Sequence, residues 1–155
     1  MLEKAVICDL DGTLITNWKK ALLLKDPLTR DPMFDWISWN KENGQYDVLN
    51  PWCGELVKAM YARDVKIIFL SARTDDGGIR SMTEDWIDLN LPEIADYELV
   101  LRQKDDYSGD PVCKMGLYYT FVAPTYEVIF AIDDTVENCS MWRNLGIVAL
   151  HCADY

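Results

Sequence analysis

Two pairs of aspartates stand at the ends of apolar runs in this sequence. Asp9 and Asp11 close the first run, in KAVICDLDGTL, and Asp133 and Asp134 close a later run, in EVIFAIDD. Alternate side chains of an extended segment point the same way, so Asp9 and Asp11 can face one site. Carboxylates gathered in one pocket would need a cation, and oxygen ligands with few nitrogens favour Mg²⁺. We therefore expect a magnesium site built from these aspartates.

Hydroxyl and cationic side chains follow the other apolar runs. Ser71 and Arg73 come after VKIIFL, Arg102 comes after YELVL, and Asp110 and Lys114 lie a little farther along the chain. Around a bound Mg²⁺ these groups suit phosphoryl transfer. One carboxylate can attack phosphorus, and a second can protonate the leaving oxygen and then activate water. The serine and the cations can hold the phosphoryl oxygens and balance their charge.

Each of these pieces also has a plainer interpretation. Asp-Leu-Asp-Gly occurs in loops, helix caps and calcium loops, and Ser71 or Thr74 can simply cap the helix that follows. An acid pair before a helix matches the positive end of the helix dipole, and Lys114 taken alone would be a solvated side chain. Their joint occurrence at the ends of successive runs favours the phosphoryl-transfer interpretation.

The elements that must position these residues alternate along the chain. Short apolar, β-branched runs predict strands at 5–8, 65–70, 97–101, 127–132 and 146–150. Apolar residues at helical spacing predict helices at 51–63, 78–89, 112–122 and 136–145. This alternation predicts an α/β fold with a parallel sheet and helices on both faces, and the nearly unbroken apolar strands agree. Sites in such folds lie at the carboxyl ends of the strands, where the polar residues stand.

Composition and charge narrow the function classes. The 155 residues suit one domain, and neither a membrane span nor a signal peptide is present, so we expect a cytoplasmic protein. The net charge of −11 opposes a broad nucleic-acid-binding face but leaves room for a pocket that takes one phosphate at a strand end. Five widely spaced cysteines without a CxxC motif indicate reduced thiols. The single histidine, His151, argues against a histidine metal site or a Ser-His-Asp triad.

One long segment, residues 16–49, interrupts the alternation. It is rich in aromatic and charged residues, and a connection of this length is usually functional or structured. Trp36 and Trp39 would share a helix face, where they could stack on a nucleobase with three further rings, those of Trp18, Phe34 and Tyr46. The favoured alternative is that these rings pack a small cap onto the core. The cations of the segment could contact a nucleic-acid backbone or be ordinary solvated charges, namely Lys19, Lys20, Arg30 and Lys41.

The pattern as a whole resembles the four motifs of the haloacid dehalogenase (HAD) superfamily. The matching residues are DLDGT at 9–13, the strand that ends in Ser71, Lys114, and AIDD at 131–134. Within that superfamily, LRQKDDYSGDPVCK at 101–114 and the segment 131–155 are similar to the 3′-phosphatase domain of bacteriophage polynucleotide kinase. The resemblance implies a Rossmann-like three-layer sandwich with the first strand at its centre and a small cap insert at 16–49.

The resemblance also implies a role for each matching residue. Asp9 would be the nucleophile and a Mg²⁺ ligand, and Asp11 would be the general acid/base, with its backbone carbonyl on the metal. Asp133 and Asp134 would complete the metal site. The phosphate-binding side chains would be Thr13, Ser71, Arg73 and Lys114. Asp110 would hold Lys114 or Arg73 in place, with Arg102 as a further supporting residue.

We therefore interpret residues 1–155 as a single HAD-like domain that is a Mg²⁺-dependent phosphomonoesterase with an aspartyl-phosphate intermediate. The favoured substrate is a 3′-phosphorylated end of DNA or RNA. The alternative substrate is a free 3′- or 5′-mononucleotide, over which residues 16–49 would close. An alternative of another class is a non-catalytic module that binds Mg²⁺ or phosphate. No Walker A motif is present, so we expect no 5′-kinase activity from this sequence.

Overall fold

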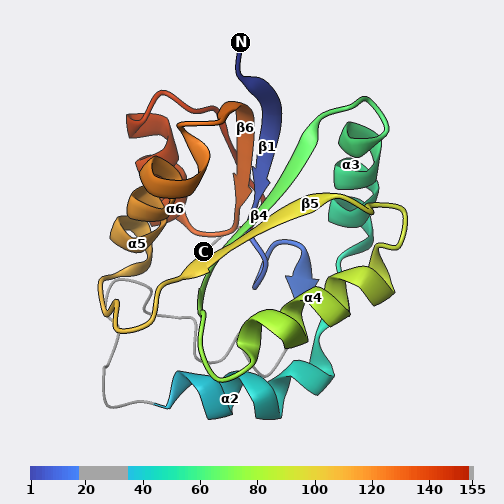
Figure 1. The fold of residues 1–155 in the computed structure, drawn as a ribbon, viewed down its shortest axis with the longest axis vertical. Coiled ribbons are helices and arrows are strands. Elements are labelled where there is room, and N and C mark those ends of the chain that lie inside the picture. The colour runs from blue at the N-terminus through green and yellow to red at the C-terminus, as the bar shows by residue number, and fades with distance from the viewer. Residues whose placement is uncertain (18–34, 154–155) are drawn as a thin grey trace.

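Five parallel strands form the central sheet of the protein, which a computed structural model describes for residues 1–17 and 35–153 (Figure 1). In sheet order they are β5 (Tyr97–Arg102), β4 (Lys66–Thr74), β1 (Glu3–Cys8), β6 (Tyr126–Asp133) and β7 (Ala149–His151). Every neighbouring pair is parallel. β1 therefore lies at the centre of the sheet, and its residues 5–8 are buried because both of its faces are covered.

Helices cover both faces of the sheet (Figure 1). α3 (Pro51–Tyr61) and α4 (Ile79–Asn90) pack their apolar side chains against β1 and β4 in one core. α5 (Asp110–Leu117) and α6 (Val136–Asn144) pack on the other face, in a second core that contains the fully buried Trp142. The prediction of a three-layer α/β sandwich with a parallel sheet is confirmed.

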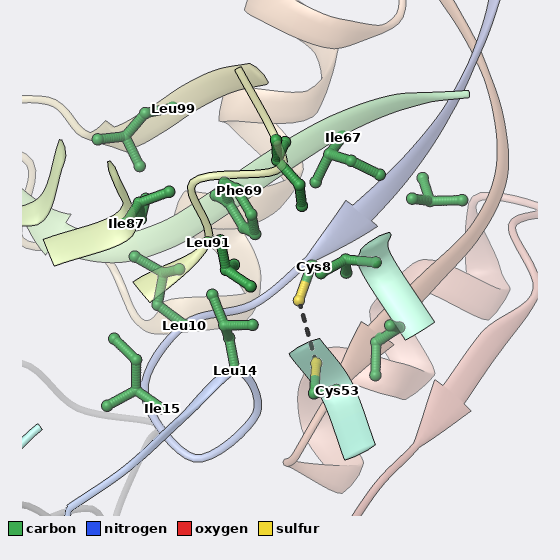
Figure 2. Packing of buried hydrophobic residues seen from close by; sticks show 14 of the residues in the cluster. Cys8, Leu10, Leu14, Ile15, Cys53, Ile67, Phe69, Ile87, Leu91 and Leu99 are labelled. Carbon is green, nitrogen blue, oxygen red and sulfur yellow. Dashed lines mark hydrogen bonds between the residues drawn. The ribbon is translucent and has the colours of Figure 1, made fainter. Parts of the chain in front are cut away.

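Two cysteines meet in the first core, at the end of β1 (Figure 2). Cys8 at the end of β1 and Cys53 on α3 are buried, and their Sγ atoms lie 3.6 Å apart. A hydrogen bond with Cys53 and burial raise the pKa of the Cys8 thiol well above its usual value, which suits a packing residue and not a reactive thiol. The other cysteines are also free thiols, as the sequence predicts.

The element bounds differ from the sequence-based ones at several places. β4 extends to Thr74, because its pairing with β5 continues beyond a register shift between Ser71 and Thr74. Gly146, with a φ of 80°, ends α6 in a left-handed turn and delays the last strand to Ala149. The helix predicted at 112–122 begins at Asp110 and ends in a π-helical turn, η2 (Tyr118–Val122). Among the described residues, none of the helices has the length and apolar character of a membrane span.

The insert at 16–49 contributes a short antiparallel pair of strands and one α-helix to the described structure. β2 (Ile15–Thr16) pairs with β3 (Val48–Leu49), and a 3₁₀ turn, η1 (Gly44–Tyr46), leads to β3 from α2 (Trp36–Asn43). Figure 1 places α2 beyond the carboxyl ends of β1 and β4. The remaining aromatic and cationic residues of interest lie outside the described residues, namely Trp18, Lys19, Lys20, Arg30 and Phe34.

Candidate active site

The residues singled out in the sequence meet at the carboxyl edge of the sheet. Asp9 follows β1 directly, Ser71 and Arg73 lie in the last part of β4, Asp133 ends β6, and Lys114 comes from α5. One pocket at this edge is lined by most of the set, namely Asp9, Asp11, Ser71, Arg73, Asp110, Lys114 and Asp134. The others stand behind the pocket wall and contact the lining residues, namely Thr13, Arg102 and Asp133.

Asp9 is held by hydrogen bonds to both of its carboxylate oxygens. The Lys114 ammonium donates to Oδ1 at 2.8 Å, and the Thr13 hydroxyl donates to Oδ2 at 3.0 Å. Gly12 permits this arrangement, because its φ of 90° turns the chain sharply after Asp11. Thr13 is fully buried, so its hydroxyl orients Asp9 from behind, whereas the sequence predicts a direct phosphate contact.

A buried charge cluster forms where β1, β6 and α5 meet. Lys114 also donates to Oδ2 of Asp133, at 2.8 Å, so one ammonium bridges two carboxylates. Burial opposes the charge on Lys114, but Asp133 and Asp9 outweigh it and raise the pKa of Lys114 well above its usual value. Burial also raises the pKa of Asp9, and Lys114 lowers that pKa only in part. A further cation beside Asp9 would keep it ionised, as its predicted role of nucleophile requires.

The Arg73 side chain lines the pocket, but its guanidinium is bound to Asp11. Its Nε and Nη2 atoms each lie 2.8 Å from a carboxylate oxygen of Asp11. Nη2 also donates to Asp47 at 3.1 Å, and Nη1 donates to the hydroxyl of Thr83 at 3.1 Å. The Arg73 side chain is 2% exposed, and these partners occupy its Nε and both of its Nη atoms. In this structure Arg73 fixes the orientation of Asp11, whereas the sequence predicts a phosphate ligand.

Asp47 is a member of the site that sequence reasoning missed. Its carboxylate is 3% exposed and accepts hydrogen bonds from Arg73 and, at 2.6 Å, from Nδ2 of Asn17. An aspartate in a long polar insert carries no signal of this role, because its partner Arg73 lies 26 residues away on a strand of the central sheet. Through Asp47, the insert helps to hold the side chain that orients Asp11.

We expect Arg73→Lys to lower kcat for phosphate release about 100-fold, with a smaller change in KM. A lysine has a single charged nitrogen and cannot hold both oxygens of Asp11, so that carboxylate loses its fixed orientation. Steady-state kinetics on a phosphomonoester measures both constants. The matched control is Arg63→Lys, at an exposed arginine outside the pocket. Equal kcat values for wild type and Arg73→Lys would contradict the positioning role.

Arg102 ties the segment before α5 to the sheet. It is fully buried, its Nη2 donates to Asp110 at 2.7 Å, and its Nε and Nη1 donate to backbone carbonyls at 2.9 and 2.7 Å. These bonds fix the start of α5, which carries Lys114 one turn later. Asp110 is thus paired with Arg102, whereas the sequence predicts contact with Lys114 or Arg73.

Three buried carboxylates offer a metal site at the wall of the pocket. One oxygen atom each of Asp9, Asp133 and Asp134 lies within 4.8 Å of the others. Burial and the neighbouring Asp133 raise the pKa of Asp134 to about 6. The raised pKa indicates, besides burial, repulsion between the two neighbouring carboxylates. The set consists of hard oxygen donors, which fits Mg²⁺. The carboxylate of Asp11, held by Arg73, is not among them.

Asn138 supports the same assignment and is a second residue that sequence reasoning missed. Its Oδ1 is the one buried side-chain oxygen or nitrogen in residues 1–17 and 35–153 that has no hydrogen-bond partner. Its Nδ2 donates to Oδ1 of Asp133 at 3.1 Å, and its side chain lines the pocket. A water molecule on a bound Mg²⁺ would supply the missing donor. Nothing in the sequence distinguishes Asn138 from the other polar residues of α6.

Two aromatic side chains of α2 complete the pocket wall. Trp36 and Trp39 line the pocket, and their ring centroids lie 5.8 Å apart with an interplanar angle of 81°. Both rings are half-buried, whereas Asp9 and Lys114 are buried, so the rings form the outer part of the wall. The expectation that Trp36 and Trp39 share a helix face is confirmed.

Two solved structures of HAD-superfamily enzymes share the fold of this chain. A HAD-superfamily hydrolase from Ehrlichia chaffeensis shares the fold with a TM-score of 0.51 and 16% identity, over 96% of this chain and 91% of that one. A HAD family enzyme from Bacteroides thetaiotaomicron, solved with magnesium and inorganic phosphate, shares it with a TM-score of 0.51 and 14% identity, over 96% and 93%. Identities this low establish the fold alone.

Residues 3–155 match the family described as the polynucleotide kinase PNKP phosphatase domain, and the chain belongs to that family. A protein of Autographa californica nuclear polyhedrosis virus that carries the name bifunctional polynucleotide kinase/RNA ligase is 27% identical over 154 residues, which are 98% of this chain and 20% of that protein. A chain of the solved Pnkp1/Rnl/Hen1 complex is 30% identical with a TM-score of 0.74, over 99% of this chain and 48% of that one. This chain thus spans less than half the length of these relatives. The family resemblance is confirmed, and the chain is a phosphatase, which argues against a non-catalytic module.

Proposed function

We propose that this chain removes the phosphate from the 3′ end of DNA or RNA, with Mg²⁺ and through an aspartyl-phosphate on Asp9. The observation that most supports this proposal is the setting of Asp9, a buried carboxylate in the pocket wall that is paired with Lys114 and grouped with Asp133 and Asp134. Membership of a family of polynucleotide kinase phosphatase domains supports a nucleic-acid end as the substrate.

In the first step an oxygen of Asp9 attacks phosphorus, and the bond between phosphorus and the 3′ oxygen breaks. The leaving oxygen takes a proton from Asp11, whose carboxyl group Arg73 holds in place. Ser71 and Lys114 hold the phosphoryl oxygens and balance the charge that develops on them. Mg²⁺, which Asp9, Asp133 and Asp134 would hold, supplies further neutralisation of those oxygens when bound.

In the second step Asp11, now a carboxylate, takes a proton from a water molecule while the oxygen of that water attacks phosphorus. The bond between Asp9 and phosphorus breaks, which releases inorganic phosphate and returns Asp9 to a carboxylate. Asp11 has regained the proton that the leaving group took, so the site is ready for the next turnover. Lys114 and Thr13 keep Asp9 oriented through both steps.

A free mononucleotide is the second candidate substrate, and the charge of the chain favours it. With a net charge of −11, the protein gains little from a long phosphate backbone. The deciding experiment compares kcat/KM, with Mg²⁺, for an oligonucleotide that carries a 3′-phosphate and for free 3′- and 5′-mononucleotides. We expect the oligonucleotide end to be preferred. A preference for a mononucleotide would replace the end-processing proposal with a nucleotide phosphatase.

Mg²⁺ is expected to raise the melting temperature of the metal-free protein by about 5–10 °C at a concentration of about 100 Kd, because it binds the folded carboxylate cluster and not the unfolded chain. Scanning fluorimetry after chelation of metals measures the shift. Asp134→Asn removes one ligand and should reduce the shift, whereas Asp85→Asn, at an exposed position on α4, should leave it intact. A melting temperature that does not respond to Mg²⁺ would contradict the assigned metal site.

A further inference from the structure

We propose that Trp36 and Trp39 form an aromatic wall against which the nucleobase of the terminal nucleotide packs, stacked on one ring and in contact with the edge of the other. This inference rests on the proposed function and names the part of the substrate that the insert recognises. The two rings stand three residues apart on α2 and line the same pocket as Asp9 and Lys114. A phosphate held at Asp9 and Lys114 would leave its nucleoside in the outer part of the same pocket, where the two rings lie.

The wall is built on a helix that is fixed in place. Asp35 caps α2 by accepting a hydrogen bond from the backbone N–H of Ser38 at 3.0 Å. Ile37 packs so closely against Gly77 that a Cβ atom there would lie 2.7 Å from its Cγ2, which sets α2 against the segment before α4. Trp36 and Trp39 also pack edge to face against each other. A preorganised aromatic surface loses little conformational entropy when a ligand binds.

The charges of the pocket favour recognition of the base over recognition of the backbone. Among the residues that the structure describes, the cationic side chains in the pocket wall are Arg73 and Lys114, and both are already paired with aspartates. Stacking of a base on an aromatic side chain contributes about 1–3 kcal/mol and needs no cation, because every base has a π-face. An acidic protein can therefore gain specificity for a nucleotide end from stacking on Trp36 and Trp39. Stacking does not require the basic groove that recognition of a phosphate backbone needs.

The test compares two oligonucleotides with a 3′-phosphate that differ only in whether the terminal nucleotide carries its base or is abasic. We expect the wild-type kcat/KM to be about 10- to 100-fold higher for the base-bearing end, as the stacking energy implies. The double variant Trp36→Leu/Trp39→Leu should reduce this ratio to near one, and Trp36→Phe/Trp39→Phe should retain most of it. Trp52→Leu, at a tryptophan on α3 that is 46% exposed and outside the pocket, is the matched control with a wild-type ratio.

The outcomes distinguish a failure of the stacking role of Trp36 and Trp39 from a failure of the proposed function. Equal kcat/KM for the two ends in the wild type, or an unchanged ratio in the leucine double variant with its melting temperature preserved, would overturn the stacking role. If the wild type hydrolyses neither oligonucleotide, the 3′-end proposal fails. The same ratio is then measured with a nucleoside 3′-monophosphate and deoxyribose 3-phosphate, so that the wall formed by Trp36 and Trp39 is still tested.

Discussion

Asp9→Asn is expected to abolish phosphate release from p-nitrophenyl phosphate in the presence of Mg²⁺, with kcat reduced at least about a thousandfold. The amide of asparagine is a poor nucleophile and removes one negative charge from the metal site. The fold should survive, because asparagine has the shape of aspartate and its oxygen can still accept a hydrogen bond from Lys114 or Thr13. Release of inorganic phosphate and the melting temperature measure the two effects separately.

The control for this substitution is Asp85→Asn, which makes the same chemical change at an exposed residue of α4. It should leave both turnover and melting temperature at wild-type values. Near-normal turnover by Asp9→Asn would remove Asp9 from the role of nucleophile, and the aspartyl-phosphate mechanism with it.

Lys114→Met should have the largest effect on stability as well as a severe effect on turnover. The ammonium of Lys114 bridges Asp9 and Asp133, and both carboxylates are buried, so its removal leaves two buried carboxylates without their shared cation. Breaking a buried ion pair in this way costs about 3–5 kcal/mol of the free energy of unfolding. Because Lys114 is proposed to bind the phosphoryl oxygens, its loss should also lower kcat about 100- to 1,000-fold.

Urea unfolding of the metal-free variant, with and without added Mg²⁺, measures the stability effect. We expect Mg²⁺ to restore part of the lost stability, because a cation in the carboxylate cluster again compensates Asp9 and Asp133. Lys104→Met, at a lysine whose side chain is 65% exposed, is the matched control and should unfold like the wild type. Wild-type stability in metal-free Lys114→Met would show that Lys114 does not hold the cluster together.

The order and type of most elements could be predicted because each buried strand is a short apolar run with polar residues directly after it. β1, β4, β5 and β6 follow this rule, and their carboxyl ends carry Asp9, Ser71, Arg102 and Asp133. Parallel strands place such residues at one edge of the sheet, so the gathering of the site needed no knowledge of side-chain contacts. The spacing of these polar residues along the chain was therefore sufficient to predict which of them gather at the site.

The finer partnerships could not be predicted, because they depend on irregularities that leave no periodic signal. The register shift in β4 lies between Ser71 and Thr74, where Arg73 turns out to pair with Asp11 and Asp47. The assignment of Asn138 to the site depends on one side-chain oxygen atom, Oδ1, that has no hydrogen-bond partner and whose position is set by the packing of α6. Propensity and hydrophobic pattern carry no information on contacts of this kind.

The central position of β1 determines when in folding the site can exist. β1 pairs with β6 from the far end of the chain, and Asp9 meets Lys114 across 105 residues. Loop closure of this length makes such pairings slow, so Asp9 has neither the Lys114 ammonium nor the neighbouring carboxylates of Asp133 and Asp134 beside it until the last large elements have docked. A nascent chain interrupted before β6 would carry DLDGT intact and still be inert. Turnover is therefore expected only from molecules in which the whole domain has folded, including the pairings between residues that lie far apart in the sequence.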